Sequence, residues 1–538
     1  METSTTSLHL SGRKIMRRKM NYNIQSPQQK STWPAHTDIL FLGVLAFGVA
    51  IRLSFLLHRG TFWFDEFFSV HFAALPWNEF IRYAILETNP PLFAFLLRAY
   101  LSLAPSMTEL WVRLPSLFLN VGSMGLLYWY GVTFFSKRTA QYSTIFFALS
   151  GIQLFLATEA RAYSLLLFLT LFSMALFTQE FLSGKHSRRT RIGFGIVQFL
   201  LLFSHLTAIL IPLIQWMCLR TTQNAKQNTR RWLATHAVIL PLWILWTGIS
   251  FFTKPKSSVL QSWYLDSLND TSHTFFDLLL SAFMNMPITP TIATLFVAAS
   301  IGMGILGWRC IKKQTEKKSL FLFIALSALL PPFIASFFGV GTTKYISIAI
   351  PALYLLVGAI FDDQIPRAKT ALSFVMIGAL LGPAATTLAS QKIFSWRDYT
   401  QYIEIHETPH SVTLIDPFQE TLPFNAYYTG TQPVVGVYLR DDTLSLEERI
   451  VRYNWNTHPV ANTELKSWIN AAIPSDADTI FLIQYGEEHS RIHDILFENG
   501  WAIRAIVPSH GIINISLFEW YASNRETTAE AGKKTQSY

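Results

Sequence analysis

Long apolar runs recur from about residue 38 to residue 389, and they constrain the fold more than any other feature of this sequence. A helix needs about 20 apolar residues to cross the hydrocarbon core of a bilayer, and several runs reach that length. Of the 538 residues, 51% are hydrophobic and 14% are charged, whereas soluble domains usually carry about 25% charged residues. Much of the surface must therefore face lipid, and we predict a polytopic α-helical membrane protein.

Short clusters of Lys and Arg lie between the apolar runs and predict their orientation. Basic residues concentrate in cytoplasmic loops, so the clusters at 13–19, 137–138 and 185–191 are placed inside the cell. The formal net charge of +9 follows from these clusters, and no nucleic-acid partner is expected. The chain is predicted to be a multi-pass protein of the inner (plasma) membrane. Its N-terminus is then cytoplasmic, and its C-terminal region is extracytoplasmic.

The apolar runs predict about eleven transmembrane helices. The predicted spans are residues 38–57, 114–135, 141–158, 163–181, 232–252, 289–308, 319–338, 345–361 and 370–389, together with two short helices within 192–219. The two short helices turn near His205, because one long span would place the following basic residues outside. The stretch 90–103 is apolar but short, begins with Pro-Pro and contains Arg98, so we predict that it lies at the membrane interface.

The composition divides the chain into four regions. Residues 1–36 form a basic cytoplasmic tail that is expected to be disordered, and residues 37–390 form the membrane domain, with an outer loop at 58–112. Residues 391–522 are predicted to form an extracytoplasmic α/β domain, and residues 523–538 a disordered tail. Within the α/β domain, strands are predicted at 412–415, 434–437, 479–483, 502–507 and 512–518, with a helix around 489–498.

The metal and disulfide chemistry of the chain is limited by its cysteines. The two cysteines, Cys218 and Cys310, lie near predicted cytoplasmic helix ends. Neither a disulfide framework nor a cysteine-based metal site is supported. No cofactor is predicted with certainty, and a divalent metal stays possible. His205 with Glu159 is the pair considered for it, although metal-ligand spacing does not support that site.

Two adjacent carboxylates, Asp65 and Glu66, follow the first predicted span within an aromatic stretch. Ionisable groups near lipid are costly and usually functional. A carboxylate there is suited to deprotonate an attacking hydroxyl as a general base. Because neighbouring residues point in different directions, one carboxylate is expected to reach the acceptor, and we favour Asp65. The alternative is a helix cap or a solvated loop charge.

A second charged group lies at the predicted outer end of the third span, where Glu159 and Arg161 are two residues apart. The functional interpretation places Glu159 beside Asp65, where it positions the acceptor or tunes a pKa, and gives Arg161 to phosphate oxygens. The alternative is an ion pair that holds two helices together. Tyr163 follows in the same motif and is a further candidate for substrate contact.

Three more candidates lie at predicted outer helix ends. Arg113 is either an anchor at the membrane interface or a ligand of a lipid phosphate. Lys344, followed by Tyr345, has the same two interpretations, and a cation there suits a departing phosphate. His205 is more often structural than a ligand in such a position.

The order of these motifs resembles the GT-C glycosyltransferases, and specifically the bacterial branch of glycosyltransferase family 39. That family includes protein O-mannosyltransferases and aminoarabinose lipid A transferases. The resemblance covers about residues 38–390. The motifs are Trp-x-Asp-Glu with Asp65-Glu66, Asn89-Pro90-Pro91-Leu92, Arg113-x-Pro-Ser, Glu159-x-Arg-x-Tyr with Tyr163, and Lys344-Tyr345 leading to Pro351.

The resemblance implies an inverting transfer of a sugar from a polyprenyl-phosphate donor, with Asp65 as the base and Glu66 beside it. Many relatives have His where this chain has Asn89, and many have Arg where it has Lys344, so substrate contacts differ at those two points. The expected partners are the lipid-linked donor, membrane lipids and a hydroxyl acceptor on a protein, a lipid or a cell-envelope glycan. The alternatives are a polyprenyl-lipid transporter or flippase, and a catalytically inactive membrane scaffold.

Overall fold

The structure of the protein is a computed structural model that describes most of the chain between residues 35 and 522. The described residues are 35–87, 89–104, 106–184, 186–253, 275, 278–279, 317–338, 343–363, 395–437, 444–453, 462–485, 491–507 and 515–522. The predicted spans at 289–308 and 370–389 lie outside the described residues, as do Cys310 and the terminal segments 1–34 and 523–538.

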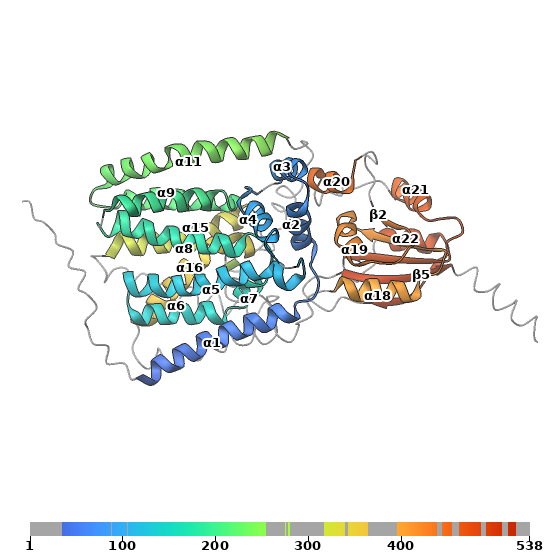
Figure 1. Cartoon of the computed structure of the whole chain (residues 1–538), viewed down its shortest axis with the longest axis horizontal. Coiled ribbons are helices and arrows are strands. Elements are labelled where there is room, and N and C mark those ends of the chain that lie inside the picture. Colours follow the sequence, from blue (N-terminus) through green and yellow to red (C-terminus); the bar gives the residue numbers. More distant parts are fainter. Residues whose placement is uncertain are drawn as a thin grey trace, which may run out of the picture.

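Within the described residues, a bundle of long helices forms one part of the molecule and a sheet with flanking helices forms the other (Figure 1). Six helical segments are long and apolar enough to cross a membrane, or seven if a bent pair counts as one span. The six are α1 (Ala35–His58), α5 (Glu109–Phe134), α8 (Tyr163–Phe177) with η1 (Thr178–Leu182), α11 (Ala225–Thr253), α15 (Lys318–Phe337), and η4 (Thr343–Ala349) with α16 (Ile350–Asp363). The bent pair is α6 (Lys137–Leu149) and α7 (Gly151–Ala157).

These segments agree with the predicted spans wherever the chain is described. The two short helices expected around His205 are also present, as α9 (Arg188–Leu202) and, beyond a short 3-10 helix η2 (Leu206–Ile209), α10 (Leu210–Leu219). The apolar stretch after Pro90 forms the short helix α4 (Leu92–Leu101), and its place at the membrane interface stays a prediction. The total of about eleven spans stays a prediction, since two of them lie outside the described residues.

The span formed by α6 and α7 is broken at Ser150, where the two helices meet at 66°. A break inside a membrane leaves backbone carbonyls without helical partners, which is costly where water is absent. The buried side chain of Arg52, from α1, donates to the carbonyls of Phe147 and Ala148 at 2.9 and 2.7 Å and to Asn120 Oδ1 at 2.9 Å. Arg52 therefore stabilises the break between α6 and α7, and α7 lies toward the end of the bundle nearest the sheet (Figure 1).

Helix α16 lies in the centre of the bundle, with most of its side chains buried. It packs closely on α6 at Gly358, where an added Cβ would collide with Ser143 Oγ and approach the carbonyl oxygen of Thr139 to 2.8 Å. The absence of a side chain at Gly358 is therefore what allows the two helices to come this close.

Replacing Gly358 by alanine is expected to destabilise the bundle by roughly 1–3 kcal/mol, because the added methyl group forces two packed helices apart. The matched control is Gly125→Ala in α5, where an added Cβ meets nothing within 4 Å. Thermal unfolding of the detergent-solubilised protein measures both variants. Equal melting temperatures for the two would contradict this account of the packing.

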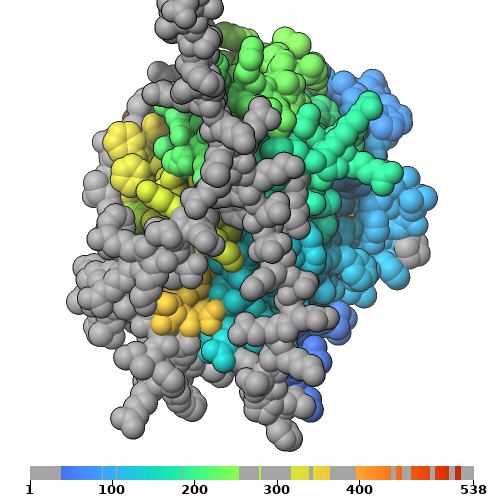
Figure 2. Space-filling model, turned by 90° about the vertical axis from the view of Figure 1, so that its left-hand side faces the viewer, coloured from blue at the N-terminus to red at the C-terminus, as the bar shows by residue number. Residues whose placement is uncertain are grey.

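Figure 2 shows the end of the bundle that faces away from the sheet. The described helix ends and connections at this end carry many basic residues. Contacts join helix ends here, including the ion pair from Lys137 to Asp38 at 2.9 Å and the hydrogen bond from Ser136 to Asp362. The basic residues of the described helix ends and connections on this side are Lys137, Arg138, Arg188, Arg189, Arg191, Arg220, Lys226, Arg230, Arg231, Lys317 and Lys318. This distribution supports the predicted cytoplasmic position of that end.

The C-terminal part contains a five-stranded sheet in the order β2-β1-β3-β5-β4. The strands are β1 (Ser411–Asp416), β2 (Val434–Gly436), β3 (Thr479–Tyr485), β4 (Trp501–Val507) and β5 (Ile515–Ala522). Strands β2, β1 and β3 are parallel, and β5 and β4 join antiparallel to β3 and to β5 respectively. Four of these strands lie within two residues of their predicted bounds, whereas β5 begins three residues later and ends four residues later than predicted. The α/β assignment is confirmed.

Helices cover both faces of this sheet, because the central strands are apolar on both sides. One face packs on α21 (Asn462–Ala472) and α22 (Arg491–Glu498), and the other on α18 (Trp396–His406) and α19 (Thr421–Tyr427). Alternation along β5 places Leu517 in one cluster and Phe518 in the other. The C-terminal part therefore has a core on each side of its sheet.

Short helices lie between the bundle and the sheet (Figure 1). They are α2 (Phe64–Ala74) and α3 (Trp77–Leu86), which lie between α1 and α5 in the sequence, together with α4. Phe64 of α2 packs in one cluster with Phe418 and Leu422, which follow β1, and with Ile450 of α20 (Leu446–Tyr453). The segment that follows β1 thus packs against α2.

Candidate functional site

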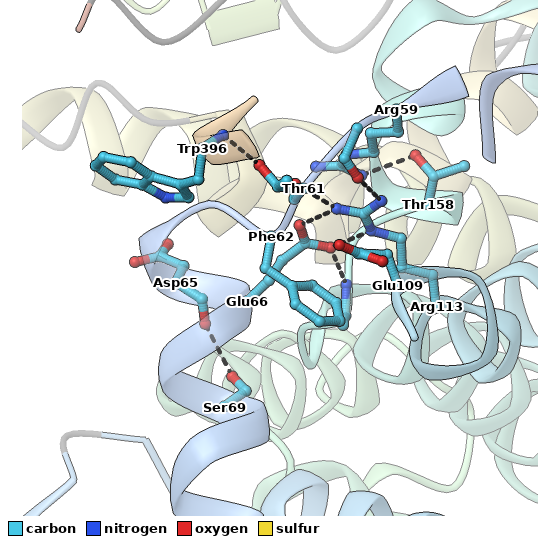
Figure 3. Close-up of polar contacts among 12 residues, drawn as sticks. Arg59, Thr61, Phe62, Asp65, Glu66, Ser69, Glu109, Arg113, Thr158 and Trp396 are labelled. Atoms are coloured by element: carbon cyan, nitrogen blue, oxygen red, sulfur yellow. Dashed lines mark hydrogen bonds and ion pairs between the residues drawn. The ribbon is translucent and has the colours of Figure 1, made fainter. Parts of the chain in front are cut away.

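The predicted acid residues lie at the start of α2, at the end of the bundle nearest the sheet. The connection from α1 to α2 is short and turns at Gly60, whose φ of 79° is readily adopted only by glycine. Asp65 and Glu66 occupy the first turn of α2, where carboxylates interact favourably with the helix dipole. Because successive residues on a helix are about 100° apart, the two side chains point to different sides (Figure 3).

Glu66 forms a fully buried ion pair with Arg113 of α5. The guanidinium donates two parallel hydrogen bonds to the carboxylate, at 2.9 and 2.7 Å, and the backbone N–H of Ala160 donates a third at 2.9 Å. Arg113 also donates to the carbonyl oxygens of Gly60 and Thr61. Burial alone would raise the pKa of Glu66, but Arg113, then Arg59, outweigh it and lower that pKa.

Glu66 and Arg113 were both candidates for direct contact with substrate, and their geometry favours a different role. Each is at most 1% exposed, and their charged atoms are directed at one another. A bidentate Arg–carboxylate pair is strong and geometrically specific. The pair therefore fixes the N-terminal end of α5 to the first turn of α2.

Asp65 is oriented differently and forms an ion pair with Lys344 at 2.7 Å. Both side chains keep some exposure, 18% and 14% respectively. The ammonium of Lys344 also lies over the ring of Trp63, 4.5 Å from its centroid. Burial would raise the pKa of Asp65, but the charges of Lys344 and Arg161 and the hydrogen bond from Lys344 lower it, so the carboxyl group is ionised.

Arg161 approaches the same turn of α2 from the connection between α7 and α8. One of its terminal nitrogens donates to Ser69 Oγ at 2.9 Å and to the carbonyl oxygen of Asp65 at 3.2 Å. Among the described residues, its other guanidinium nitrogens have no hydrogen-bond partner. Arg161 is thus held in place and still has donors for an anion.

Glu159 is buried beside these charges without being paired. It is 1% exposed, and neither carboxylate oxygen has a hydrogen-bond partner among the described residues. Burial raises its pKa to about 7, against the opposing effects of Lys344 and Arg59. A carboxyl group with this pKa exchanges its proton near neutral pH, which suits acid–base chemistry.

Replacing Glu159 by glutamine is expected to remove a pH dependence of stability. The unfolded chain releases this proton near pH 4.5, whereas the folded chain keeps it up to about 7. Between these values the folded state binds more protons, so the free energy of unfolding of the wild type falls as the pH rises. The melting temperature of the glutamine variant should therefore fall less between about pH 5 and pH 8. Equal slopes in the two proteins would contradict the burial of an unpaired carboxyl group.

An aromatic group completes this side of the site. The rings of Tyr163 and His205 have centroids 5.5 Å apart, and Tyr345 lies 6.2 Å from Tyr163 and 5.8 Å from His205. The backbone N–H of Thr207 donates to His205 Nδ1, so the proton of the neutral ring is on Nε2, which has no partner among the described residues. Burial, then Arg161 and Lys344, lower the pKa of His205 to about 3, which keeps the ring neutral.

A pocket opens beside Arg161, Tyr163 and His205, and Asn89 lies on its wall. Most of the other lining side chains are aromatic or apolar and come from α2, α3 and the start of α4. They include Phe68, Phe72, Phe80, Tyr83, Pro90, Pro91 and Phe93. An apolar cavity with a few converging polar groups is the usual form of a ligand site.

All ten residues that the sequence singled out therefore lie at the same end of the bundle, and the segment 159–161 contacts the turn that carries Asp65 and Glu66. Sequence reasoning missed Arg59, which donates to Thr158 Oγ1 at 2.8 Å next to Glu159. Arg59 could have been found from its position directly after the first predicted span, where Asp65 and Glu66 also follow. In the described part of the chain, no group of three or more His, Cys, Asp or Glu residues is placed to hold a metal ion.

No protein-family model matches the chain, and no curated protein matches its sequence. The structure of ArnT from Cupriavidus metallidurans in the apo state is similar, with a TM-score of 0.54 and 13% identity over 90% of this chain and 98% of that chain. ArnT from the same organism bound to undecaprenyl phosphate matches with a TM-score of 0.53, 13% identity and the same coverage. At this identity the likeness shows the fold. The chain is therefore a polytopic α-helical membrane protein with the fold of ArnT and a C-terminal α/β domain.

Proposed function

We propose that this protein is a glycosyltransferase that moves a sugar from a polyprenyl-phosphate donor to a hydroxyl group on the extracytoplasmic face of the inner membrane. The observation that carries the proposal is the convergence of two carboxylates, Asp65 and Glu159, with two cations, Lys344 and Arg161, at one end of a membrane bundle. The fold it shares with ArnT, which was solved with undecaprenyl phosphate bound, supports the class of donor.

The charges in this arrangement suit a displacement at the anomeric carbon. Asp65 accepts the proton of the acceptor hydroxyl, the oxygen bonds to the anomeric carbon with inversion, and the bond to the lipid phosphate breaks. Lys344 and Arg161 stabilise the negative charge that develops on the leaving phosphate. The donor phosphate also partly neutralises Lys344, which raises the pKa of Asp65 and makes it a stronger base when the donor is bound.

The remaining candidate residues support this chemistry in two ways. Glu159 binds the acceptor hydroxyl or tunes Asp65, and Tyr163, Tyr345 and His205 form the wall against which the sugar lies. The aromatic pocket beside Arg161, with Asn89 at its edge, receives the prenyl carbons nearest the phosphate. In this proposal residues 37–390 form the catalytic domain, and residues 391–522 lie outside the cell membrane with the site.

A transporter is the principal alternative, because it predicts charged residues and broken helices inside the membrane. The structure contains both features at Arg52 and the α6–α7 break. Each of the three guanidinium nitrogens of Arg52 donates to a protein oxygen. All the guanidinium nitrogens of Arg52 are therefore used within the protein. Glu159 and His205, which keep buried polar atoms without a hydrogen-bond partner among the described residues, lie instead beside Asp65 and Lys344.

The proposed function can be tested with purified protein in vesicles and a panel of undecaprenyl-phosphate monosaccharides labelled in the sugar. Membranes from the source cells supply the pool of acceptors, and the label is counted in their protein, lipid and glycan fractions. Transfer of label into any of these fractions, with release of undecaprenyl phosphate, supports the glycosyltransferase. Movement of the intact donor across the bilayer indicates a transporter. If neither transfer nor movement is observed, the protein is a scaffold.

A further inference from the structure

The connection that carries the acid residues is held by the C-terminal domain as well as by the membrane domain. Arg113 of α5 contacts the carbonyl oxygens of Gly60 and Thr61. The next contacts come from more than 300 residues away: the N–H of Trp396 donates to Thr61 Oγ1 at 2.8 Å, and the N–H of Phe62 donates to the hydroxyl of Tyr427 at 3.1 Å. Figure 3 shows Trp396 reaching Thr61 beside the start of α2.

Tyr427 also connects the segment 60–67, which carries Asp65 and Glu66, to α5, the helix whose Arg113 pairs with Glu66. Its hydroxyl donates to Glu109 Oε1 at 3.0 Å, and Arg397 of the C-terminal domain forms an ion pair with the same carboxylate at 2.6 Å. Glu109 is the first residue of α5, and Arg113 follows one turn later. The hydroxyl of Tyr427 therefore accepts a hydrogen bond from the backbone at Phe62 and donates one to Glu109 at the start of α5.

Packing adds to these hydrogen bonds. The ring of Tyr427 packs against the buried cluster that contains Phe62, Val112 and Ala160, and the guanidinium of Arg397 lies 5.0 Å from the centroid of that ring. Farther along α2 and α3, His71 pairs with Glu447 and Arg82 with Glu448 of α20. The C-terminal domain thus contacts the segment 60–67, the start of α5, and α2 and α3 at His71 and Arg82.

We propose that the C-terminal domain is a positioning element of the acid site, and that Tyr427 is its principal positioning residue. The hydroxyl of Tyr427 fixes the backbone at Phe62, three residues before Asp65, relative to α5. Small displacements of a reacting group cost large factors in rate, so this contact controls the geometry of Asp65 without touching substrate. The effect on transfer rests on the proposed function, whereas the effect on the segment 60–67 does not.

The decisive variant is Tyr427→Phe, which removes the hydroxyl and keeps the ring. The matched control is Tyr428→Phe, because the hydroxyl of Tyr428 bonds to Glu407 and accepts from Gln432 within the C-terminal domain. Thr61→Val, which removes the acceptor for the N–H of Trp396, tests the second contact. All three are made in the full-length protein.

Hydrogen–deuterium exchange measures the segment directly and needs no substrate. In Tyr427→Phe, amides in a peptide covering 60–67 should exchange about fivefold to tenfold faster, as expected for the loss of one hydrogen bond. A peptide covering β3 should exchange as in the wild type, which excludes general unfolding. Tyr428→Phe should leave the 60–67 peptide unchanged. If the 60–67 peptide behaves alike in both tyrosine variants, the proposal is wrong.

Turnover of the labelled undecaprenyl-phosphate sugar that the wild type transfers provides the second measurement. Tyr427→Phe should lower kcat about tenfold and leave KM for that donor within about twofold, because the residue orients Asp65 and does not bind the donor. An unchanged kcat, or a loss confined to KM, overturns the positioning role. If the wild type transfers none of the sugars, the proposed function fails, and the exchange measurement still decides the role of Tyr427.

Discussion

Replacing Arg113 by methionine is expected to destabilise the protein by about 3–5 kcal/mol, the usual cost of removing one partner of a buried ion pair. Glu66 would stay buried with a single donor, the N–H of Ala160. The carbonyl oxygens of Gly60 and Thr61 would lose the donors supplied by Arg113 as well. The melting temperature of the solubilised protein, or its denaturant unfolding, measures this loss.

The matched control is Arg397→Met, which removes an arginine from an ion pair at the protein surface. Arg397 is 58% exposed, and an exposed pair is worth about 1 kcal/mol or less. The double variant Glu66→Gln with Arg113→Met should recover part of the loss, because it leaves no buried charge unpaired. If Arg113→Met is as stable as the control and loses only donor affinity, Arg113 is a phosphate ligand.

The architecture of the membrane domain was largely predictable, because its signals are local. Apolar length marks each span, and clusters of basic residues mark one side of the membrane. The turn at His205 was predicted from charge alone, since the basic residues after it had to return to the same side. The break at Ser150 was not predicted, because it depends on Arg52 reaching the carbonyls of Phe147 and Ala148 from another helix.

The candidate site was predictable in its residues and much less so in their partners. The motifs predicted that Asp65, Glu159 and Lys344 belong to one site, and the structure places these residues close together. That Arg113 pairs with Glu66 and Lys344 with Asp65 depends on which side of α2 each carboxylate faces. The contact of Tyr427 with Phe62 joins residues 365 positions apart, and no local pattern indicates it.

Replacing Asp65 by asparagine is expected to lower transfer by roughly 100-fold to 10,000-fold, the range usually contributed by general acid–base catalysis. Asparagine has almost the same shape and can still accept a hydrogen bond from Lys344, so the fold and the affinity for the donor should change little. The variant cannot accept the proton of the acceptor hydroxyl. The measurement is single-turnover transfer of a labelled undecaprenyl-phosphate sugar in vesicles, together with binding of undecaprenyl phosphate.

Two further variants separate proton transfer from charge balance in this prediction. Glu79→Gln removes an exposed carboxylate of α3 and should transfer at the wild-type rate. Lys344→Met removes the cation that faces Asp65, so it should weaken binding of undecaprenyl phosphate as well as slow transfer. Raising the pH should not restore transfer by the asparagine variant, because the side-chain amide of asparagine does not become a base at any pH used for the assay. Transfer by Asp65→Asn at the rate of the Glu79→Gln control would reassign the base to Glu159, the unpaired carboxyl group of the site.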